Sequence, residues 1–366
     1  MRIGMMIGSL SRGGAERVLL NIASDCRSKG HEVFIVTQFR SEEEYTVPEG
    51  IERIVFGLTP EEETGSGLKN LRLRVKKLRN VWINKKPDVI LSFIGKNNFM
   101  AIRTGHSLGI PVVAAVRAIR DMEYYTPAMR ILADRYLGRA ERVVFQSRDN
   151  LEAFSGSVKR KAVILKNPID RSFFEKIWEG ERERRIVSVG RVDKDKNHRL
   201  LIDAFAAIIA GGEAEGWTLE IYGDGELREE LVSYIESLGL ADRIFMMGRT
   251  QDTAESIKKA GVFVLPTNCE GYPNALIEAM ILGIPCLSTD CPAGGPRELI
   301  THGTNGLLTP VGDLQKMKEN LQFFINNRQE RNRIGENAKK TAAIYSPETV
   351  LGEWEKVLTE AAKARK

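Results

Sequence analysis

The chain of 366 residues is long enough for two domains of ordinary size. Hydrophobic residues make up 42% and charged residues 28% of it, a balance typical of a globular protein that excludes a disordered or fibrous chain. No stretch reaches the apolar length of a membrane-spanning helix. The apolar start at 2–8 lacks the cleavage pattern of a signal peptide, so we expect a first strand there.

Charge is distributed unevenly along the chain. The first 170 residues contain 28 lysines and arginines against 19 acidic residues, a net charge of +9, whereas the rest contains 26 against 30, a net charge of −4. We therefore expect an anionic partner for the first half. The four cysteines show neither metal-site spacing nor a disulfide framework, so we expect a reducing, cytoplasmic location.

The first half alternates short apolar runs with helical sequence. We expect strands at 2–8, 32–37, 88–93, 111–116, 142–146 and 162–165, a first helix at 14–29, and helical sequence between most of the other strands. Such alternation predicts a parallel, doubly wound sheet. The pattern breaks at Asn167-Pro168-Ile169-Asp170, and the charged segment 179–185 is typical of an exposed linker.

A second alternating set follows this break. We expect strands at 186–190, 218–222, 243–247, 261–265 and 284–288, and helices at 198–209, 226–238 and 275–280. After the capping signal Ser346-Pro347-Glu348 comes a last helix that carries Trp354. We therefore predict two α/β domains, 1–168 and 169–346, with the last helix at 347–366 packed back on the first domain.

Glycines follow the first predicted strand, in Ser9-Leu10-Ser11-Arg12-Gly13-Gly14-Ala15-Glu16. Paired glycines such as Gly13 and Gly14 allow a backbone to approach a pyrophosphate at the start of a helix. The segment lacks the Gly-Lys-Ser/Thr of a P-loop and the spacing of a dinucleotide fingerprint. An ordinary tight turn is the alternative interpretation.

Two cations follow the first strand of the second half, in Gly190-Arg191-Val192-Asp193-Lys194-Asp195-Lys196-Asn197. The guanidinium of Arg191 and the ammonium of Lys196 at the end of a strand can neutralise a diphosphate group. Cations in a loop are more often simply solvated, but the position between a strand and a helix favours a role in binding. Loops at 223–227 and 248–250 end later strands and add Arg249 as a weaker candidate.

The most informative stretch is 266–296, which starts where a short apolar run ends. Pro273 and Asn274 are start signals for the helix that follows. Loops at the carboxyl ends of strands are where open α/β sheets bind ligands. The backbone amides around Gly271, Tyr272 and Asn274 would therefore form an anion site at the helix N-terminus.

Two carboxylates bracket this anion site. Glu270 lies in the loop and Glu278 about one turn into the helix, so both can face the same crevice. Beside a phosphate site, acids are suited to sugar hydroxyls or to developing positive charge rather than to the phosphate. Two solvated surface glutamates are the alternative.

The segment 68–86 contains eight lysines and arginines and no acid, with Leu71, Val75, Leu78 and Trp82 at helical spacing. The basic face could bind an anionic membrane surface or a diphosphate-linked lipid. A solvated helix that packs its apolar stripe on its own sheet is the alternative. Nucleic acid is not expected, because aromatic stacking partners and a recognisable module are missing.

Gly105-His106-Ser107-Leu108-Gly109 matches the Gly-x-Ser-x-Gly pattern of a hydrolase nucleophile elbow. That elbow needs a strand before the serine and a helix after it. Here the predicted helix comes first and the strand second, so we expect Ser107 to be structural.

Three motifs together resemble the family 4 glycosyltransferases: Gly13-Gly14-Ala15-Glu16, Gly190-Arg191 with Lys196-Asn197, and Glu270-x7-Glu278. The resemblance extends over essentially the whole chain. It implies the GT-B fold, with two Rossmann-like doubly wound α/β domains facing a cleft. It also implies a retaining, metal-independent hexosyltransferase without a cofactor, whose second half binds the nucleotide sugar and whose first half binds the acceptor.

The same resemblance implies roles for individual residues. Arg191 and Lys196 would stabilise the departing diphosphate. Glu270 would contact the sugar near the reacting centre, and Glu278 would bind the ribose hydroxyls. The remaining donor-binding residues implied in this way are Gly14, Arg249, Gly271, Tyr272, Pro273 and Asn274. Asp193 and Asp195 could be mistaken for a metal-binding pair, but they lie between basic residues and in the wrong architecture.

One position departs from the family. Many members carry a histidine after the strand that corresponds to 112–116, near the reacting sugar, whereas this sequence has Arg117 there. An arginine is not a base at neutral pH, so we expect an electrostatic catalytic role. His-dependent details of the family mechanism do not carry over to this chain.

Among family members, the sequence is most similar to those that assemble bacterial surface polysaccharides or lipid-linked oligosaccharides. The expected donor is a UDP-hexose or UDP-HexNAc, and the expected acceptor is a polyprenyl-diphosphate-linked glycan or another oligosaccharide at the inner face of the cell membrane. Two alternatives remain: a non-catalytic nucleotide-sugar-binding protein, and a nucleotide-sugar epimerase on the same fold.

Overall fold

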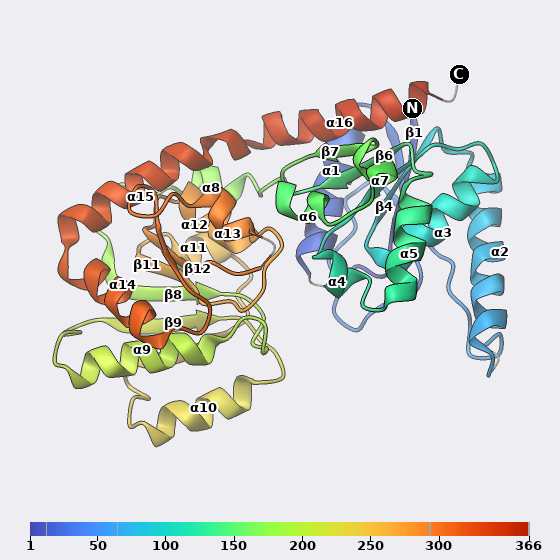
Figure 1. Ribbon diagram of the computed structural model, residues 1–366. Coiled ribbons are helices and arrows are strands. Elements are labelled where there is room, and N and C mark those ends of the chain that lie inside the picture. Colours follow the sequence, from blue (N-terminus) through green and yellow to red (C-terminus); the bar gives the residue numbers. More distant parts are fainter. Residues whose placement is uncertain (12, 64, 293, 365–366) are drawn as a thin grey trace. The chain divides into compact units, whose positions relative to one another are not determined.

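The computed structural model describes residues 1–11, 13–63, 65–292 and 294–364, to which all statements on structure below refer. The chain forms two compact units, one of Met1–Pro168 with Pro347–Lys366 and the other of Ile169–Ser346. Each unit is a parallel sheet covered by helices on both faces (Figure 1). The predicted pair of doubly wound α/β domains is confirmed.

The sheet of unit 1 has the strand order β3-β2-β1-β4-β5-β6-β7. Its strands are β1 (Arg2–Ile7), β2 (Glu32–Thr37), β3 (Glu52–Val55), β4 (Val89–Phe93), β5 (Val112–Ala115), β6 (Arg142–Phe145) and β7 (Ala162–Ile164). Its helices are α1 (Gly14–Ser28), α2 (Gly67–Lys85), α3 (Gly95–His106), α4 (Arg120–Glu123), α5 (Pro127–Leu137), α6 (Arg148–Glu152), α7 (Gly156–Lys159) and α16 (Pro347–Lys363). The order reverses between β1 and β4, and ligands of doubly wound sheets bind outside such a reversal.

The sheet of unit 2 has the order β10-β9-β8-β11-β12-β13 and reverses between β8 and β11. Its strands are β8 (Glu183–Val189), β9 (Thr218–Tyr222), β10 (Ile244–Gly248), β11 (Ala260–Leu265), β12 (Cys286–Thr289) and β13 (Leu307–Thr309). Its helices are α8 (Ser172–Glu175), α9 (His198–Ala210), α10 (Arg228–Ser237), α11 (Thr253–Ile257), α12 (Asn274–Ile281), α13 (Gly295–Leu299), α14 (Leu314–Asn326), α15 (Arg328–Ala342) and the 3-10 turn η1 (Ala343–Tyr345).

Each sheet separates two apolar cores. In unit 1, α1 and α16 pack on one face, and α2, α3 and α5 pack on the other (Figure 1). In unit 2, α9, α10 and α14 cover one face, and α8, α11 and α12 cover the other. The central strands are buried on both sides, which is why they read in the sequence as continuous apolar runs.

Three expectations for the strands were wrong, and the first is that β13, a strand of only three residues, was missed. Strand β3 was missed because it is a four-residue edge strand in which two of the four side chains are charged. The segment 179–185, expected to be a linker, enters the sheet at Glu183 as the start of β8. Its charged side chains do not prevent this, because Arg182 and Arg185 donate to the backbone carbonyls of Leu282 and Ser256 at 2.8 and 2.7 Å.

The Gly-x-Ser-x-Gly sequence has the structural role expected of it. Helix α3 ends at His106, and the Ser107 hydroxyl donates to the Thr104 carbonyl at 2.8 Å. A Cβ on Gly105 would lie 2.6 Å from the Val112 side chain, so this glycine allows the helix to pack closely on β5.

The last helix, α16, is fixed to unit 1 by Trp354. This side chain is fully buried, its ring centroid lies 5.9 Å from that of Phe93, and its indole N–H donates to the Lys166 carbonyl at 2.9 Å. The helix therefore completes the core of unit 1, although unit 2 precedes it in the chain.

Replacing Trp354 with alanine should destabilise unit 1 by about 3–5 kcal/mol, because a large buried ring and its hydrogen bond are lost. Native-state hydrogen exchange of the β1 and β4 amides measures this free energy. Lys356→Ala, on the exposed side of the same helix, is the control and should change it by less than about 0.5 kcal/mol. Equal protection in the two variants would contradict this account of α16.

Candidate active site

In unit 2, the loops that follow β8 and β11 are tied to each other. The Asp195 carbonyl accepts from the Asn268 amide at 2.7 Å and from the Thr267 hydroxyl at 2.8 Å. Asn268 also donates its side-chain amide to the Lys194 carbonyl at 2.9 Å. Because β8 and β11 are neighbours at the reversal of strand order, their loops leave the same edge of the sheet side by side.

This connection brings Lys196 to Glu270. The Lys196 ammonium forms an ion pair with the Glu270 carboxylate, and both side chains are largely buried, at 17% and 18% exposed. The Asp193 carboxylate accepts from the Lys196 amide at 3.0 Å and fixes the backbone of the cation. Two residues that the sequence places in separate motifs, 74 positions apart, thus meet at one strand edge.

Arg191 lies in the same loop but is placed differently. Its side chain is 73% exposed and pairs with Asp193 at 3.1 Å rather than with Glu270. Arg249, after β10, is half-exposed, and its Nε lies 3.8 Å from the Asp224 carboxylate. Both arginines stand at the carboxyl edge of the sheet, but the structure joins only Lys196 directly to Glu270.

The remaining predicted donor residues surround the start of α12. Pro273 is the N-cap and Asn274 the first residue of this helix, as the start signals predicted. The Tyr272 hydroxyl shares a hydrogen bond with the Tyr345 hydroxyl, and burial raises the pKa of Tyr272 to about 12. Glu278 is 2% exposed within the helix.

Close backbone approaches set the shape of these loops. A Cβ on Gly295, the first residue of α13, would lie 2.2 Å from the Gly271 carbonyl oxygen. A Cβ on Gly223, whose φ is +144°, would lie 1.8 Å from the Gly190 carbonyl oxygen. The glycines thus let the loops after β8, β9, β11 and β12 stack on one another.

A cavity of about 240 Å³ adjoins the loop after β8, on the side of α9 and α10. Its lining includes Asp193, His198, Leu231 and Asn268, but neither Lys196 nor Glu270. Burial, assisted by the charge of Lys196, lowers the pKa of His198 to about 4, so this ring is neutral at pH 7. His198 therefore supports the loop without adding charge to it.

In unit 1, a second polar cluster lies at the carboxyl ends of β1, β4 and β5. Gly14 begins α1 and is exposed. Arg117 follows β5, with its guanidinium carbon 5.0 Å from the Phe93 ring centroid. With the Gln146 amide oriented to donate to the Val116 carbonyl, its oxygen accepts from Arg117 Nη1 at 2.8 Å.

Two carboxylates balance the charge of Arg117. Burial lowers the pKa of Arg117 to about 10, and the charges of Glu123 and Glu16 oppose that change, so Arg117 remains a cation at neutral pH. Burial likewise raises the pKa of Glu16, against the effect of its backbone hydrogen bond and of Arg117. The cluster therefore combines a protonated guanidinium with two carboxylates that offset its charge.

Family models match both halves of the chain. The model described as Glycosyltransferase Family 4 matches residues 12–173, and the one described as Glycosyl transferases group 1 matches residues 170–341. The chain belongs to the family 4 glycosyltransferases.

Curated relatives span the whole enzyme. One, from Campylobacter jejuni, is GalNAc-alpha-(1->4)-GalNAc-alpha-(1->3)-diNAcBac-PP-undecaprenol alpha-1,4-N-acetyl-D-galactosaminyltransferase, 27% identical over the full length of both chains. Another from the same organism, N-acetylgalactosamine-N,N'-diacetylbacillosaminyl-diphospho-undecaprenol 4-alpha-N-acetylgalactosaminyltransferase, is 27% identical over 94% of this chain and 95% of its own.

Solved structures establish the fold. HepE of Anabaena, in a crystal structure with UDP-glucose, has a TM-score of 0.82 and 22% identity over 98% of this chain and 100% of its own. Sucrose-phosphate synthase from Thermosynechococcus elongatus has a TM-score of 0.79 and 16% identity over 99% of both chains. The glycosyltransferase therefore has the GT-B fold.

Sequence reasoning missed one important residue of this enzyme, Glu123. It lies six positions after Arg117, on a four-residue helix, and no spacing rule connects the two. The segment 117–123 holds two arginines and two acids, so nothing in it singled out Glu123. Glu16 was read as part of a glycine motif, and its proximity to Arg117 could not be predicted from the chain alone.

Gly223→Ala should destabilise unit 2 by roughly 3 kcal/mol or more. The added methyl group would overlap the Gly190 carbonyl, and the alanine would be held at a positive φ that it rarely adopts. Thermal or urea unfolding of unit 2 measures the effect. Gly212→Ala is the matched control: its φ is +75° and its added methyl group meets nothing within 4 Å, so only the conformational cost of about 1–2 kcal/mol remains. Equal effects would show that the loops do not stack as described.

Proposed function

We propose that this glycosyltransferase transfers a hexose or N-acetylhexosamine, with retention of configuration, from a UDP-sugar to a polyprenyl-diphosphate-linked glycan in the assembly of bacterial surface polysaccharide or related glycans. The convergence of Lys196 and Glu270 at the strand edge of unit 2 carries the donor part of this proposal. The complex of HepE with UDP-glucose supports UDP, and the undecaprenyl-diphosphate glycans named for the Campylobacter relatives support the acceptor.

The proposed reaction joins the acceptor oxygen to the anomeric carbon while the bond from that carbon to the diphosphate oxygen breaks. The acceptor proton ends on the released UDP, and the new bond forms on the face that the diphosphate leaves. Lys196 stabilises the charge that develops on the leaving diphosphate. Arg191, whose side chain is exposed, contacts the same diphosphate when the donor binds. The amides at the start of α12 supply further donors to the same group.

The carboxylates act on the sugar side in this proposal. Glu270 binds hydroxyl groups of the transferred sugar near the anomeric carbon, and Glu278 binds the ribose. Arg249 and Tyr272 line the nucleotide site, and Arg117 stabilises charge on the acceptor side. Unit 2 is thus the donor domain and unit 1, with α16, the acceptor domain.

We further propose that transfer needs neither metal ion nor cofactor. The positive charge that a metal would give to the diphosphate comes from Lys196 and Arg191. Asp193 is engaged with both of these residues, by the Arg191 ion pair at 3.1 Å and the Lys196 amide at 3.0 Å. Among the residues that the structure describes, no group of three or more metal-ligating side chains comes together.

Lys196→Ala should lower the rate of UDP release from the cognate UDP-sugar by about 100-fold, because one preorganised cation at the leaving group is lost. A screen of UDP-, GDP- and ADP-sugars, with and without a synthetic undecaprenyl-diphosphate-linked sugar, identifies the donor of the parent enzyme. Glu319→Gln, on the exposed face of α14, is the control and should leave the rate unchanged.

Three outcomes of this screen would contradict the proposal. Binding of a UDP-sugar without UDP release would indicate a non-catalytic binding protein. Interconversion of sugars without net UDP release would indicate an epimerase. Neither stabilisation nor turnover with any of the nucleotide sugars would remove the donor assignment.

Helix α2 supports an approach of unit 1 to an anionic membrane surface. Leu78 and Trp82 are buried, with Trp82 donating to the Thr104 hydroxyl at 2.9 Å, so the carboxyl half of the helix packs on the sheet as the apolar stripe predicted. In the amino half, Leu68 and Leu71 are 73% and 45% exposed instead. The cations of the helix that face solvent are Lys69, Arg72, Lys76 and Arg79.

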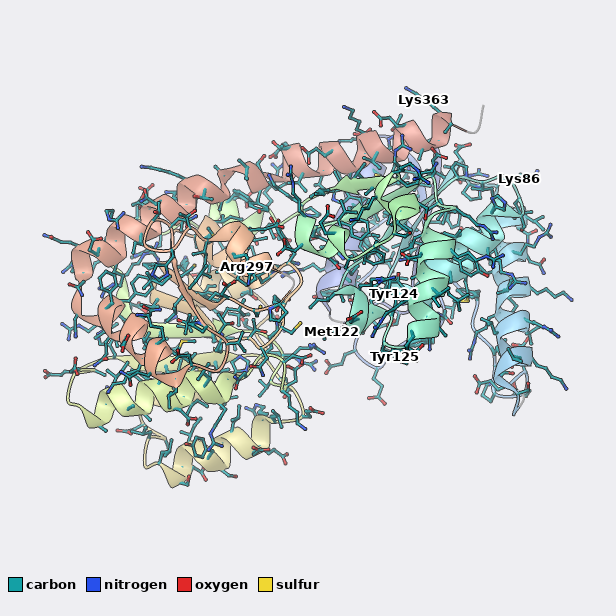
Figure 2. The ribbon with its side chains drawn as sticks, in the orientation of Figure 1. Lys86, Met122, Tyr124, Tyr125, Arg297 and Lys363 are labelled. Carbon is teal, nitrogen blue, oxygen red and sulfur yellow. The ribbon has the colours of Figure 1, made fainter. Side chains whose placement is uncertain are left out.

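The described part of the chain has no helix that is both long and apolar enough to cross a membrane. We propose that unit 1 binds the membrane surface through α2, because this helix exposes both leucines and cations. Met122 and Tyr125, 49% and 61% exposed around α4, add apolar surface to the same unit (Figure 2). A peripheral position of this kind would let the enzyme reach a lipid-linked acceptor at the inner face of the cell membrane.

Replacing Lys69, Arg72 and Lys76 together with glutamine should lower binding to vesicles that contain phosphatidylglycerol by at least tenfold, since each cation near an anionic surface contributes about 1 kcal/mol. Co-sedimentation with these vesicles, and with vesicles of phosphatidylcholine alone, measures the effect. The triple variant Lys318→Gln, Lys339→Gln and Lys340→Gln removes the same charge from unit 2 and should bind like the parent. Equal loss in both triple variants would show a non-specific charge effect instead.

A further inference from the structure

The carboxylate of Glu123 joins two loops of unit 1. One oxygen accepts from the backbone amide of Gly95, at the start of α3, at 2.7 Å. The other accepts from the backbone amides of Arg117 and Ala118, after β5, at 2.8 and 2.9 Å. Glu123 is the last residue of the short helix α4, and its chain neighbours Met122 and Tyr124 are labelled in Figure 2.

Keeping a carboxylate in this position has a cost. Burial raises the pKa of Glu123, against the three backbone hydrogen bonds, which lower it. If the only role of this carboxylate were to end the helix, it would be more stable when exposed to water, because burial disfavours the charged form. The side chain is instead held where its oxygens satisfy amides that the surrounding loops would otherwise leave without partners.

The turn that Glu123 holds is itself strained. Ile94, directly before Gly95, has a φ of +72° and a ψ of 122°. A β-branched side chain is rarely found at such angles, and such a conformation persists only where the surroundings impose it. The Gly95 amide bonded to Glu123 is one such constraint, at the carboxyl end of the central strand β4.

The other loop carries Arg117. Because the backbone amide of Arg117 is bound to Glu123, the backbone position of Arg117 is fixed. The Phe93 ring and the Gln146 oxygen then orient the guanidinium. Its Nε is buried and has no hydrogen-bond partner among the described residues.

We propose that Glu123 is a positioning residue, which clamps the turn at Ile94-Gly95 to the loop after β5 and thereby fixes the Arg117 guanidinium toward the acceptor. This inference rests on the proposed transfer reaction. Glu123 touches backbone amides and not the reacting groups, so its effect passes through Arg117. The alternative is a carboxylate that contributes stability only.

A double-mutant cycle separates these two roles. Glu123→Gln places a donor group against the amide donors and should lower kcat by about 10- to 100-fold, as expected for a misplaced electrostatic group, with KM for the nucleotide sugar within about twofold of the parent. Arg117→Ala should cost at least as much. The double variant should equal Arg117→Ala, because a residue that acts through Arg117 has nothing left to position.

Glu355→Gln is the matched control. Glu355 is a partly buried carboxylate of the same unit, on α16, paired with Lys29 at 2.9 Å and His31 at 3.0 Å just before β2. These partners lie at the amino ends of the strands, away from Arg117. Its kcat should therefore equal that of the parent enzyme.

Each outcome decides the matter. Three results would overturn the role of Glu123. The two substitutions could multiply their effects on kcat in the double variant, the kcat of Glu123→Gln could stay within threefold of the parent, or it could exceed that of the parent. If Glu123→Gln does not fold, Glu123→Asp, whose shorter side chain reaches fewer of the amides, replaces it in the same cycle. A parent enzyme that transfers no sugar would overturn the proposed function itself and the role of Glu123 with it.

Discussion

The ion pair between Lys196 and Glu270 is the interaction on which the candidate site of unit 2 depends. Both side chains are mostly removed from water, so either charge alone would be costly, and each holds the other in place. An ammonium has three N–H donors, and the pair engages only part of them. Lys196 is thus oriented by the protein while still able to bind a phosphate oxygen. The reversal of strand order between β8 and β11 makes this possible, because it sends two loops past the same edge of the sheet.

The two units carry different charged groups at the carboxyl edges of their sheets. In unit 2, cations and the start of a helix stand at the strand ends, an arrangement that suits a diphosphate. In unit 1, the corresponding edge carries one partly buried guanidinium, with Glu16 and Glu123 acting on its charge. The positive charge of this guanidinium is offset by the two carboxylates, which suits an uncharged sugar hydroxyl better than a free phosphate.

Much of this arrangement could be predicted from the sequence. Apolar runs and glycine-bearing loops predicted both sheets, and the motifs at 190–197 and 270–278 predicted that Lys196 and Glu270 come together. Such features are local, or repeat with the period of a strand. The clamp of Glu123 is neither, because it joins backbone amides of residues 95, 117 and 118 through a fold that brings them together. The strain at Ile94 has no signal at all, since an isoleucine at the end of an apolar run predicts ordinary strand geometry.

The pairing of each cation with an acid bears on the proposed chemistry. In the proposed reaction Arg117 stays protonated and the acceptor proton goes to the departing diphosphate, which serves as leaving group and base at once. Cations that stabilise a leaving oxygen also lower its basicity, and an excess of them would slow the proton transfer that the same step needs. Here Lys196 is paired with Glu270 and Arg191 with Asp193, so an acid offsets the charge of each cation. The neighbouring acids thus reduce the positive charge that the two cations present to the diphosphate. This balance fits a reaction in which the diphosphate has to accept a proton as it leaves.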